Sequence, residues 1–301
     1  MSAAGDSVVK FELTDERKTI GSEVLYRIRA VEDIPIQGVK KGDLGGWVES
    51  LYLDDGTPRL SGNARMSGNA RMSGNAVMSE NAQMSENAQM FGDARMSGNA
   101  VMSGNARMSE NAQMFGDARM FENARMSENA VMSGNAWMSE NAQMFGNAWM
   151  FENARMSGNA VMSGNAWMFE NAVMSGNAWM LENAQMFGNA RMSENAQMFG
   201  DARMSGNACV AGEGDICLPS HVITVGPIGS ENVTATLYRS RGEDGHELRV
   251  GCWTGTIQSL MAEVARRREN WDAPAEVQEA WVAQYKALEA LCDATVAGWG
   301  A

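Results

Sequence analysis

The side chains best suited to chemistry lie in the last third of the chain. Both histidines and all the cysteines are there: His221, His246, Cys209, Cys217, Cys252 and Cys292. A cysteine beside a histidine can form a thiolate–imidazole pair for nucleophilic catalysis, and Cys252 with either histidine would supply one. No spacing identifies an acid or amide partner, and Cys252 ends an apolar strand, so we predict that it is a buried, inert thiol.

Zinc is the second chemistry that these residue types allow. Cys209, Cys217, His221 and Cys252 are suitable ligands, but their spacing matches no common zinc finger. The many methionines of the chain could hold Cu(I) through their thioethers, although each also occupies the place of a core aliphatic residue. We therefore predict no bound metal and no cofactor.

The elements that position these residues form a C-terminal α+β module, residues 210–301. Alternating apolar residues predict strands and apolar residues three and four apart predict helices. We expect three short strands and two helices, at 221–225, 233–239, 246–253, 256–268 and from Pro274 onward. The candidate site residues of this module are His221, Pro227, Cys252 and Trp253.

A repeat of six residues fills the middle of the chain, residues 60–209. It comprises 25 uninterrupted hexads, and 24 of the 26 methionines recur at this spacing from Met66 to Met204. Apart from Leu60 in the first hexad and Leu181 in a later one, each hexad has methionine, serine or phenylalanine, glycine or glutamate, asparagine or aspartate, alanine and one variable residue. Six is a multiple of the strand period and not of the helix period, so a fixed stripe of methionine and alanine predicts short strands joined by turns.

These hexads resemble the hexapeptide repeats of the left-handed β-helix superfamily, best known from acyltransferases. The resemblance implies a mainly β fold, a triangular parallel solenoid in which three hexads make a coil of about 18 residues. The 25 hexads then give about eight coils, or about 40 Å of solenoid at a strand spacing of about 4.8 Å. Methionine takes the aliphatic position of the family, which is a departure from its usual branched residues.

With 18 residues in a coil, aromatic side chains gather on one outer face of the solenoid. They are Trp149, Phe151, Trp167, Phe169 and Phe187. Contiguous exposed aromatic residues are typical of interaction surfaces, whereas cross-strand aromatic pairs can also serve only to stabilise a sheet. We predict a surface for a partner or for a second copy of the chain.

Residues 1–59 are expected to form a β cap that covers the open strand edges at the first coil. The segment Gly42–Ser50 lacks the spacing of a phosphate-binding loop, and we expect Trp47 to plug the first coil. This GDLGGWVES segment and the GPIGS and GCWTGT segments at 226–230 and 251–256 resemble those of bacterial and phage hexapeptide-repeat proteins, for which no activity is implied.

The charge and hydropathy of the chain exclude several partners. The net charge is −13, and each of the three predicted domains is acidic, at −3, −4 and −6 along the chain, so we expect no nucleic acid bound through its phosphates. No apolar run approaches the roughly 18 residues of a membrane span, and residues 1–10 do not have the order of a secretory signal. We expect a cytoplasmic protein with reduced cysteines.

The resemblance to acyltransferases also implies a histidine base in or beside the coils, near a subunit boundary. Both His221 and His246 lie beyond the repeats, and no loop interrupts the hexads to cover a coenzyme. The sequence therefore predicts that the chain is not an enzyme, because the catalytic function does not follow from the fold alone.

We interpret the chain as a non-catalytic β-helical scaffold of phage or prophage type. It would bind a host protein or self-associate as a homo-oligomer, through its C-terminal module and the aromatic face, and a small-molecule ligand remains open. Three alternatives are a phage counter-defence factor that sequesters a host protein or a nucleotide signal, an acidic DNA mimic, and a hexapeptide-repeat acyltransferase with a relocated site.

Overall fold

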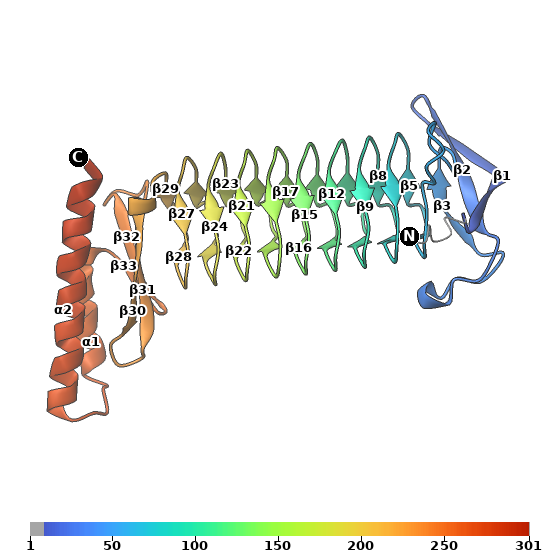
Figure 1. Cartoon of the computed structure of the whole chain (residues 1–301). Coiled ribbons are helices and arrows are strands. Elements are labelled where there is room, and N and C mark those ends of the chain that lie inside the picture. The colour runs from blue at the N-terminus through green and yellow to red at the C-terminus, as the bar shows by residue number, and fades with distance from the viewer. Residues whose placement is uncertain (1–8, 301) are drawn as a thin grey trace, which may run out of the picture. The chain divides into compact units, whose positions relative to one another are not determined.

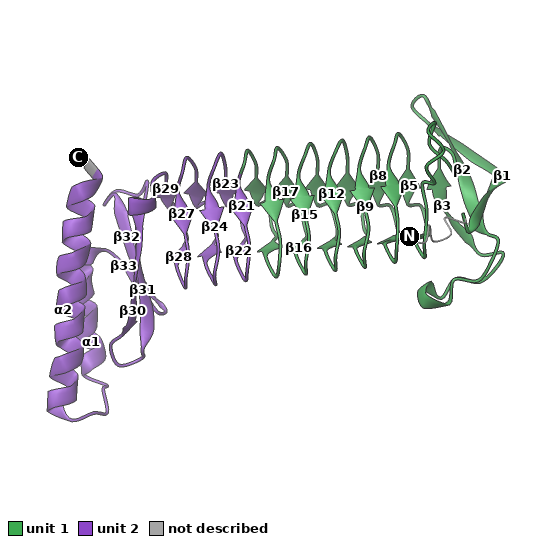
Figure 2. Cartoon of the chain, in the orientation of Figure 1, with its two compact units in different colours: residues 1–165 green, residues 166–301 purple. Residues whose placement is uncertain are grey.

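The structure is a computed structural model that describes residues 9–300. It divides into two compact units, residues 1–165 and 166–301 (Figure 2). Each unit contains part of the repeat, so the division does not follow the predicted boundaries at 59/60 and 209/210, which stay a prediction. No helix among the described residues is long and apolar enough to cross a membrane.

Each hexad forms one strand of two residues, its variable residue and the methionine that follows, and the chain then turns (Figure 1). In the last hexad, valine takes the place of that methionine. Each strand pairs in parallel with the strand 18 residues further along, as Val101 with Arg119 and Met102 with Met120. The predicted 18-residue coil and the mainly β, parallel solenoid of about eight turns are therefore confirmed.

The first unit contains three such sheets. One consists of β5 (Arg71–Met72), β8 (Gln89–Met90), β11 (Arg107–Met108), β14 (Arg125–Met126), β17 (Gln143–Met144) and β20 (Val161–Met162). The second consists of β4 (Arg65–Met66), β7 (Gln83–Met84), β10 (Val101–Met102), β13 (Arg119–Met120), β16 (Trp137–Met138) and β19 (Arg155–Met156). The third consists of β6 (Val77–Met78), β9 (Arg95–Met96), β12 (Gln113–Met114), β15 (Val131–Met132) and β18 (Trp149–Met150).

The repeat strands of the second unit follow the same pattern and form three sets. Their strands are β21 (Trp167–Met168), β24 (Gln185–Met186) and β27 (Arg203–Met204); β22 (Val173–Met174), β25 (Arg191–Met192) and β28 (Cys209–Val210); and β23 (Trp179–Met180), β26 (Gln197–Met198) and β29 (Asp215–Ile216). β29 extends the solenoid beyond the last methionine hexad.

The core of the solenoid consists of the methionine and alanine side chains. All the methionines from Met66 to Met204 are at most 2% exposed, and so are the alanines of the same hexads. The variable residue points outward because side chains alternate along a strand. Flexible thioether side chains fill this interior in place of branched aliphatic ones.

The corners of the solenoid carry backbone strain that the sequence does not reveal. The residue with positive φ is the first of each turn pair, glycine or glutamate, and ten glutamates adopt φ of 56° to 60°. The asparagine and aspartate residues of the repeats do not adopt positive φ. There the asparagine amides form ladders, as where Asn129 Nδ2 donates to Asn147 Oδ1 at 3.0 Å.

The N-terminal strands join the first unit at one edge of a sheet. β1 (Phe11–Ile20) and β2 (Glu23–Ala30) form an antiparallel hairpin, β3 (Leu44–Val48) pairs with β2, and a 3-10 turn, η1 (Pro35–Gln37), lies between them. β3 then pairs in parallel with β5. The predicted β cap is present, but Trp47 does not plug the coil: it lies in register with the outward Arg71, and Val48 is the buried residue.

The C-terminal module has four strands rather than three. They are β30 (Val222–Ile228), β31 (Val233–Arg239), β32 (His246–Val250) and β33 (Trp253–Gly255), and a turn, η2 (Pro219–His221), precedes them. The expected strand 246–253 is split because Gly251 adopts a φ of +61° and reverses the chain. The helices α1 (Ile257–Arg268) and α2 (Ala275–Ala297) follow, and η3 (Gly298–Gly300) ends the described chain.

The sheet of this module docks on the last coil of the second unit. The backbone N–H of Cys209 donates to Thr236 Oγ1 at 3.2 Å, and that of Ala211 donates to the Tyr238 hydroxyl at 3.4 Å. Tyr238 is fully buried, and its hydroxyl donates a short hydrogen bond to Glu247 Oε1. These contacts occupy backbone donors that would otherwise remain unpaired at the end of the solenoid.

Candidate functional site

The aromatic residues predicted for one outer face are partly exposed in each unit. In the first unit, Trp149 on β18 is 43% exposed and Phe151 follows it, half-buried. In the second unit, Trp167 on β21 is 41% exposed, and the rings of Phe169 and Phe187 stack at 5.1 Å between centroids with 8° between planes. Two further tryptophans outside the predicted face are similarly exposed, Trp137 at 39% and Trp179 at 45%.

The stack in the second unit follows directly from the coil length. Phe169 and Phe187 are 18 residues apart, and their strands are neighbours because Trp167 pairs with Gln185. Such stacking contributes stability in its own right. Trp167 lies two residues before Phe169 in the chain.

The four predicted residues of the C-terminal module do not form one site. His221 is buried directly before β30, whereas the exposed Pro227 lies near the far end of that strand, about 20 Å away at about 3.3 Å per residue. Cys252 and Trp253 lie at the β32–β33 turn, and Trp253 packs partly buried on the module's core. The four residues are separated because the sequence does not show which ends of neighbouring strands lie together, and His221 and Pro227 lie at opposite ends of β30.

The turn near Pro227 is shaped by packing. A Cβ added at Gly229 would lie 1.9 Å from the Tyr285 hydroxyl oxygen, and the Gly229 N–H donates to Gln284 Oε1 at 2.7 Å. The glycine of the GPIGS segment is therefore required by the close approach of α2.

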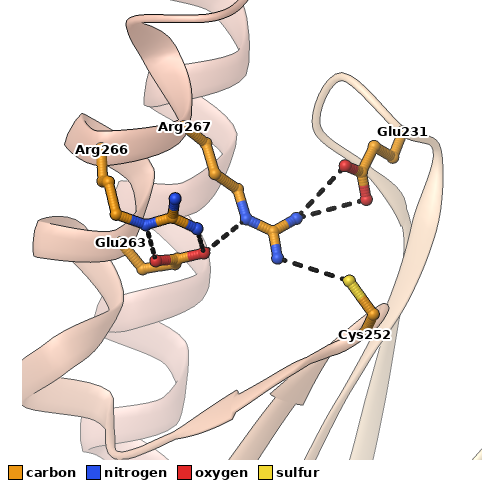
Figure 3. Close-up of polar contacts among 5 residues, drawn as sticks. All are labelled: Glu231, Cys252, Glu263, Arg266 and Arg267. Atoms are coloured by element: carbon orange, nitrogen blue, oxygen red, sulfur yellow. Dashed lines mark hydrogen bonds and ion pairs between the residues drawn. The ribbon is translucent and has the colours of Figure 1, made fainter.

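Cys252 is exposed rather than buried, so our prediction for its environment is wrong. The turn at Gly251 carries it to the surface, where Arg267 Nη2 lies 3.6 Å from its Sγ. Figure 3 shows that Arg267 also reaches toward Glu231 and Glu263. Its Nη1 is 3.3 Å from both Glu231 oxygens, and its Nε is 2.6 Å from Glu263 Oε1. No histidine contacts Cys252 through a hydrogen bond among the described residues.

Glu263 is held by both arginines of this cluster, which gives a pH-dependent contribution to stability. Hydrogen bonds from Arg266 and Arg267 lower the pKa of Glu263 from 4.5 to about 2. A carboxylate with a lowered pKa stabilises the fold above its unfolded pKa, and this contribution is lost as the pH falls from about 4.5 to about 2.

We expect Glu263→Gln to lower the melting temperature of the C-terminal module at pH 7 by roughly 2 to 4 °C. Circular dichroism at 222 nm follows α1 and α2 and measures it. The difference between the two proteins should shrink between pH 4.5 and 2. A difference in melting temperature that stays constant down to pH 2 would contradict the lowered pKa of Glu263.

The structure instead pairs His221 with Cys217, which the sequence analysis had grouped with it only as a candidate zinc ligand. Cys217 Sγ lies 3.2 Å from His221 Nδ1. Arg239 Nη1 lies 3.3 Å from the same sulfur and 3.2 Å from Asp215 Oδ2. The spacing of four residues between Cys217 and His221, across a single turn, was the signal that could have identified this pair.

The environment of His221 favours the neutral imidazole. Burial lowers its pKa, the Arg239 guanidinium lowers it further, and Asp215 opposes both. A neutral imidazole beside a thiol can accept the thiol proton, as in nucleophilic cysteine sites. Among the described residues, no group of three or more histidine, cysteine or acidic side chains is arranged to hold a metal ion.

His246 and Cys292 have structural environments. The Ile257 N–H at the start of α1 lies 3.2 Å from His246 Nε2, and His246 Nδ1 lies 2.8 Å from the Asp244 carbonyl oxygen. Both ring nitrogens are thus engaged with the backbone. Cys292 is buried in α2, where burial raises the pKa of its thiol to about 12.

Comparison with solved structures finds several acyltransferases that are similar to parts of this chain. A UDP-N-acetylglucosamine acyltransferase from Francisella novicida is 14% identical, with 53% of this chain and 66% of that chain covered and a TM-score of 0.29. LpxA from Bacteroides fragilis, also a UDP-N-acetylglucosamine acyltransferase, is 11% identical, with coverage of 79% and 89% and a TM-score of 0.38. LpxA from Acinetobacter baumannii is 10% identical, with coverage of 51% and 71% and a TM-score of 0.25. No family model and no curated protein matches the chain.

These structures correct our expectation that the chain is not an enzyme. The solved structures that share its fold are acyltransferases, so the absence of a histidine from the coils does not establish a non-catalytic protein. The likeness concerns the fold, and the chain covers just under two thirds of the Francisella novicida protein. We carry over no substrate and no catalytic residue from it.

Proposed function

We propose that the chain is a β-helical binding scaffold that self-associates through its exposed aromatic strands. The observation that carries this proposal is the exposure of Trp149 and Trp167, each about two-fifths open to solvent and each followed by a phenylalanine two residues further along the chain. Tryptophan is enriched among the residues that contribute most to protein interfaces. A second copy of the chain fits such a surface, because each copy presents the same apolar side chains.

The charge of the chain also favours a protein partner over nucleic acid. With a net charge of −13 and glutamates at the corners of the coils, the surface would repel a phosphate backbone. The exposed Pro227 and Cys252 of the C-terminal module are our second candidates for contact with a partner. A phage or prophage origin and a cytoplasmic location remain predictions from the sequence.

We expect the purified full-length chain to form a defined homo-oligomer. The double variant Trp167→Ser/Phe169→Ser should convert it to a monomer, because the aromatic surface of the second unit is lost. Size-exclusion chromatography with light scattering measures the mass, and circular dichroism verifies that the variant is folded.

Trp179→Ser is the matched control for this test. Trp179 belongs to the same unit and is equally exposed, but it lies on β23, in a different sheet from β21. The control should keep the oligomeric mass. A monomeric wild-type protein, or an unchanged mass in the double variant, would refute self-association through this surface. An equal loss of oligomeric mass in the double variant and in Trp179→Ser would show that the association is not specific to Trp167 and Phe169.

A further inference from the structure

Trp47 lies on the outer surface of the first unit, within a row of cationic side chains. It pairs in register with Arg27 on β2 and with Arg71 on β5, so the three side chains share one side of the sheet. Lys18 Nζ lies 4.0 Å from the centroid of the indole, and Arg27 Cζ lies 5.6 Å from it. Cations over an aromatic face are favourable, but the ring does not neutralise their charge.

Two of these cations lack a counter-charge. Arg27 forms an ion pair with Glu16 at 3.1 Å, whereas neither Lys18 nor Arg71 forms one with any residue of the described chain. The Arg71 Nε is buried without a hydrogen-bond acceptor, and so is Trp47 Nε1. Burying a donor or a charge without a partner costs free energy, so an acceptor that bound here would remove part of this cost.

The ammonium group of Lys18 would be favoured by an anion bound beside it. Burial, together with the charges of Arg71 and Arg27, lowers the pKa of Lys18 from 10.5 to about 8. An anion in contact with the ammonium group would favour its charged form and raise the pKa again.

A groove adjoins these cations between the tip of the β1–β2 hairpin and the outer surface of β5 and β8. Its volume is about 290 Å³, and Arg71 forms part of its wall. Ile20, Leu25 and Phe91 provide apolar lining, and Phe91 is 37% exposed. Glu23, next to the hairpin tip, is the acidic residue of this lining. A groove of this size accommodates a small molecule.

We propose that this part of the first unit binds a small organic anion. A phosphate or carboxylate head would lie against Arg71 and Lys18, and an apolar portion would occupy the groove beside Phe91. Guanidinium groups form strong charge-assisted hydrogen bonds with such oxyanions. A polymeric anion is disfavoured, because Glu23 also lines the groove and would repel a second phosphate there.

Lysine side-chain NMR of the full-length chain, titrated with phenyl phosphate, tests the proposal. We expect saturating phenyl phosphate to raise the pKa of Lys18 by at least one unit. The affinity for phenyl phosphate should fall as the pH rises above the pKa of Lys18 in the unliganded protein, about 8, because the ammonium group loses its charge. Inorganic phosphate should bind about tenfold more weakly, since it leaves the groove empty. Benzyl alcohol, which has the ring without the charge, should not shift the Lys18 signal.

Arg71→Gln should weaken phenyl phosphate binding at least tenfold. Arg107→Gln is the matched control, because Arg107 lies in the same outward row two strands further along and does not line the groove. An equal loss of phenyl phosphate affinity in both variants would indicate general charge attraction and would refute the proposed site. So would an unchanged Lys18 signal at 10 mM phenyl phosphate in the wild-type protein, or equal binding of benzyl alcohol.

Discussion

Replacing Met114 by alanine is expected to lower the free energy of unfolding of the first unit by about 2 to 5 kcal/mol. Met114 lies on β12 with no exposed surface, and it pairs in register with Met96 and Met132 of the neighbouring coils. The neighbouring methionines cannot move into the cavity fully, because their own backbones are fixed by hydrogen bonds between coils. The loss of stability therefore has two parts: the lost transfer free energy of the removed atoms and the free-energy cost of the cavity that they leave.

Urea denaturation followed by circular dichroism measures this effect. Met114→Leu conserves volume and should cost less than about 1.5 kcal/mol. Gln113→Ala changes the adjacent outward residue of the same strand and should stay within about 0.5 kcal/mol. A loss at Met114 no larger than that at Gln113 would mean that the methionine interior is not packed as described.

Replacing Tyr238 by alanine is expected to detach the C-terminal sheet from the last coil of the second unit. Tyr238 is fully buried, and its hydroxyl contacts both Glu247 and the Ala211 N–H. Truncation of a buried aromatic side chain costs about 3 to 5 kcal/mol, and here it also leaves a carboxylate and a backbone donor unpaired. The freed edge of the solenoid would then pair with other chains.

Light scattering against protein concentration, together with thermal unfolding, measures both consequences. Tyr238→Phe keeps the ring and removes the hydroxyl, so it should cost about 1 to 3 kcal/mol without aggregation. Tyr52→Ala is a control at an exposed tyrosine and should change neither property. A Tyr238→Ala variant that remains monodisperse at the wild-type melting temperature would contradict the capping role of this sheet.

The hexads by themselves determined the solenoid. A period of six with methionine and alanine always on one side can be satisfied by strands and not by helices, so strand positions, the buried stripe and the outward rows follow from local chemistry. The 18-residue coil came from the family resemblance, and the pairing of Val101 with Arg119 confirms it. The aromatic pair Phe169 and Phe187 could be placed together because the repeat converts sequence distance into spatial distance.

Outside the repeat, the sequence predicted most helices and strands but not which of them lie next to one another. The helices and most strands of the C-terminal module were expected, but the turn at Gly251, the exposure of Cys252 and the separation of His221 from Pro227 were not. These depend on which strand ends meet and on close approaches such as that of Tyr285 to Gly229, and a linear pattern carries no such information.

Only the tertiary structure determines which reactive and charged side chains come into contact. Cys217 meets His221 because η2 turns the chain back, and Arg239 joins them from a strand 22 residues later. Lys18, Trp47 and Arg71 come together because β3 pairs with both the hairpin and the first unit's solenoid. Periodic contacts recur at a fixed separation and can be predicted, whereas these contacts join segments whose spacing along the chain bears no relation to their distance in space.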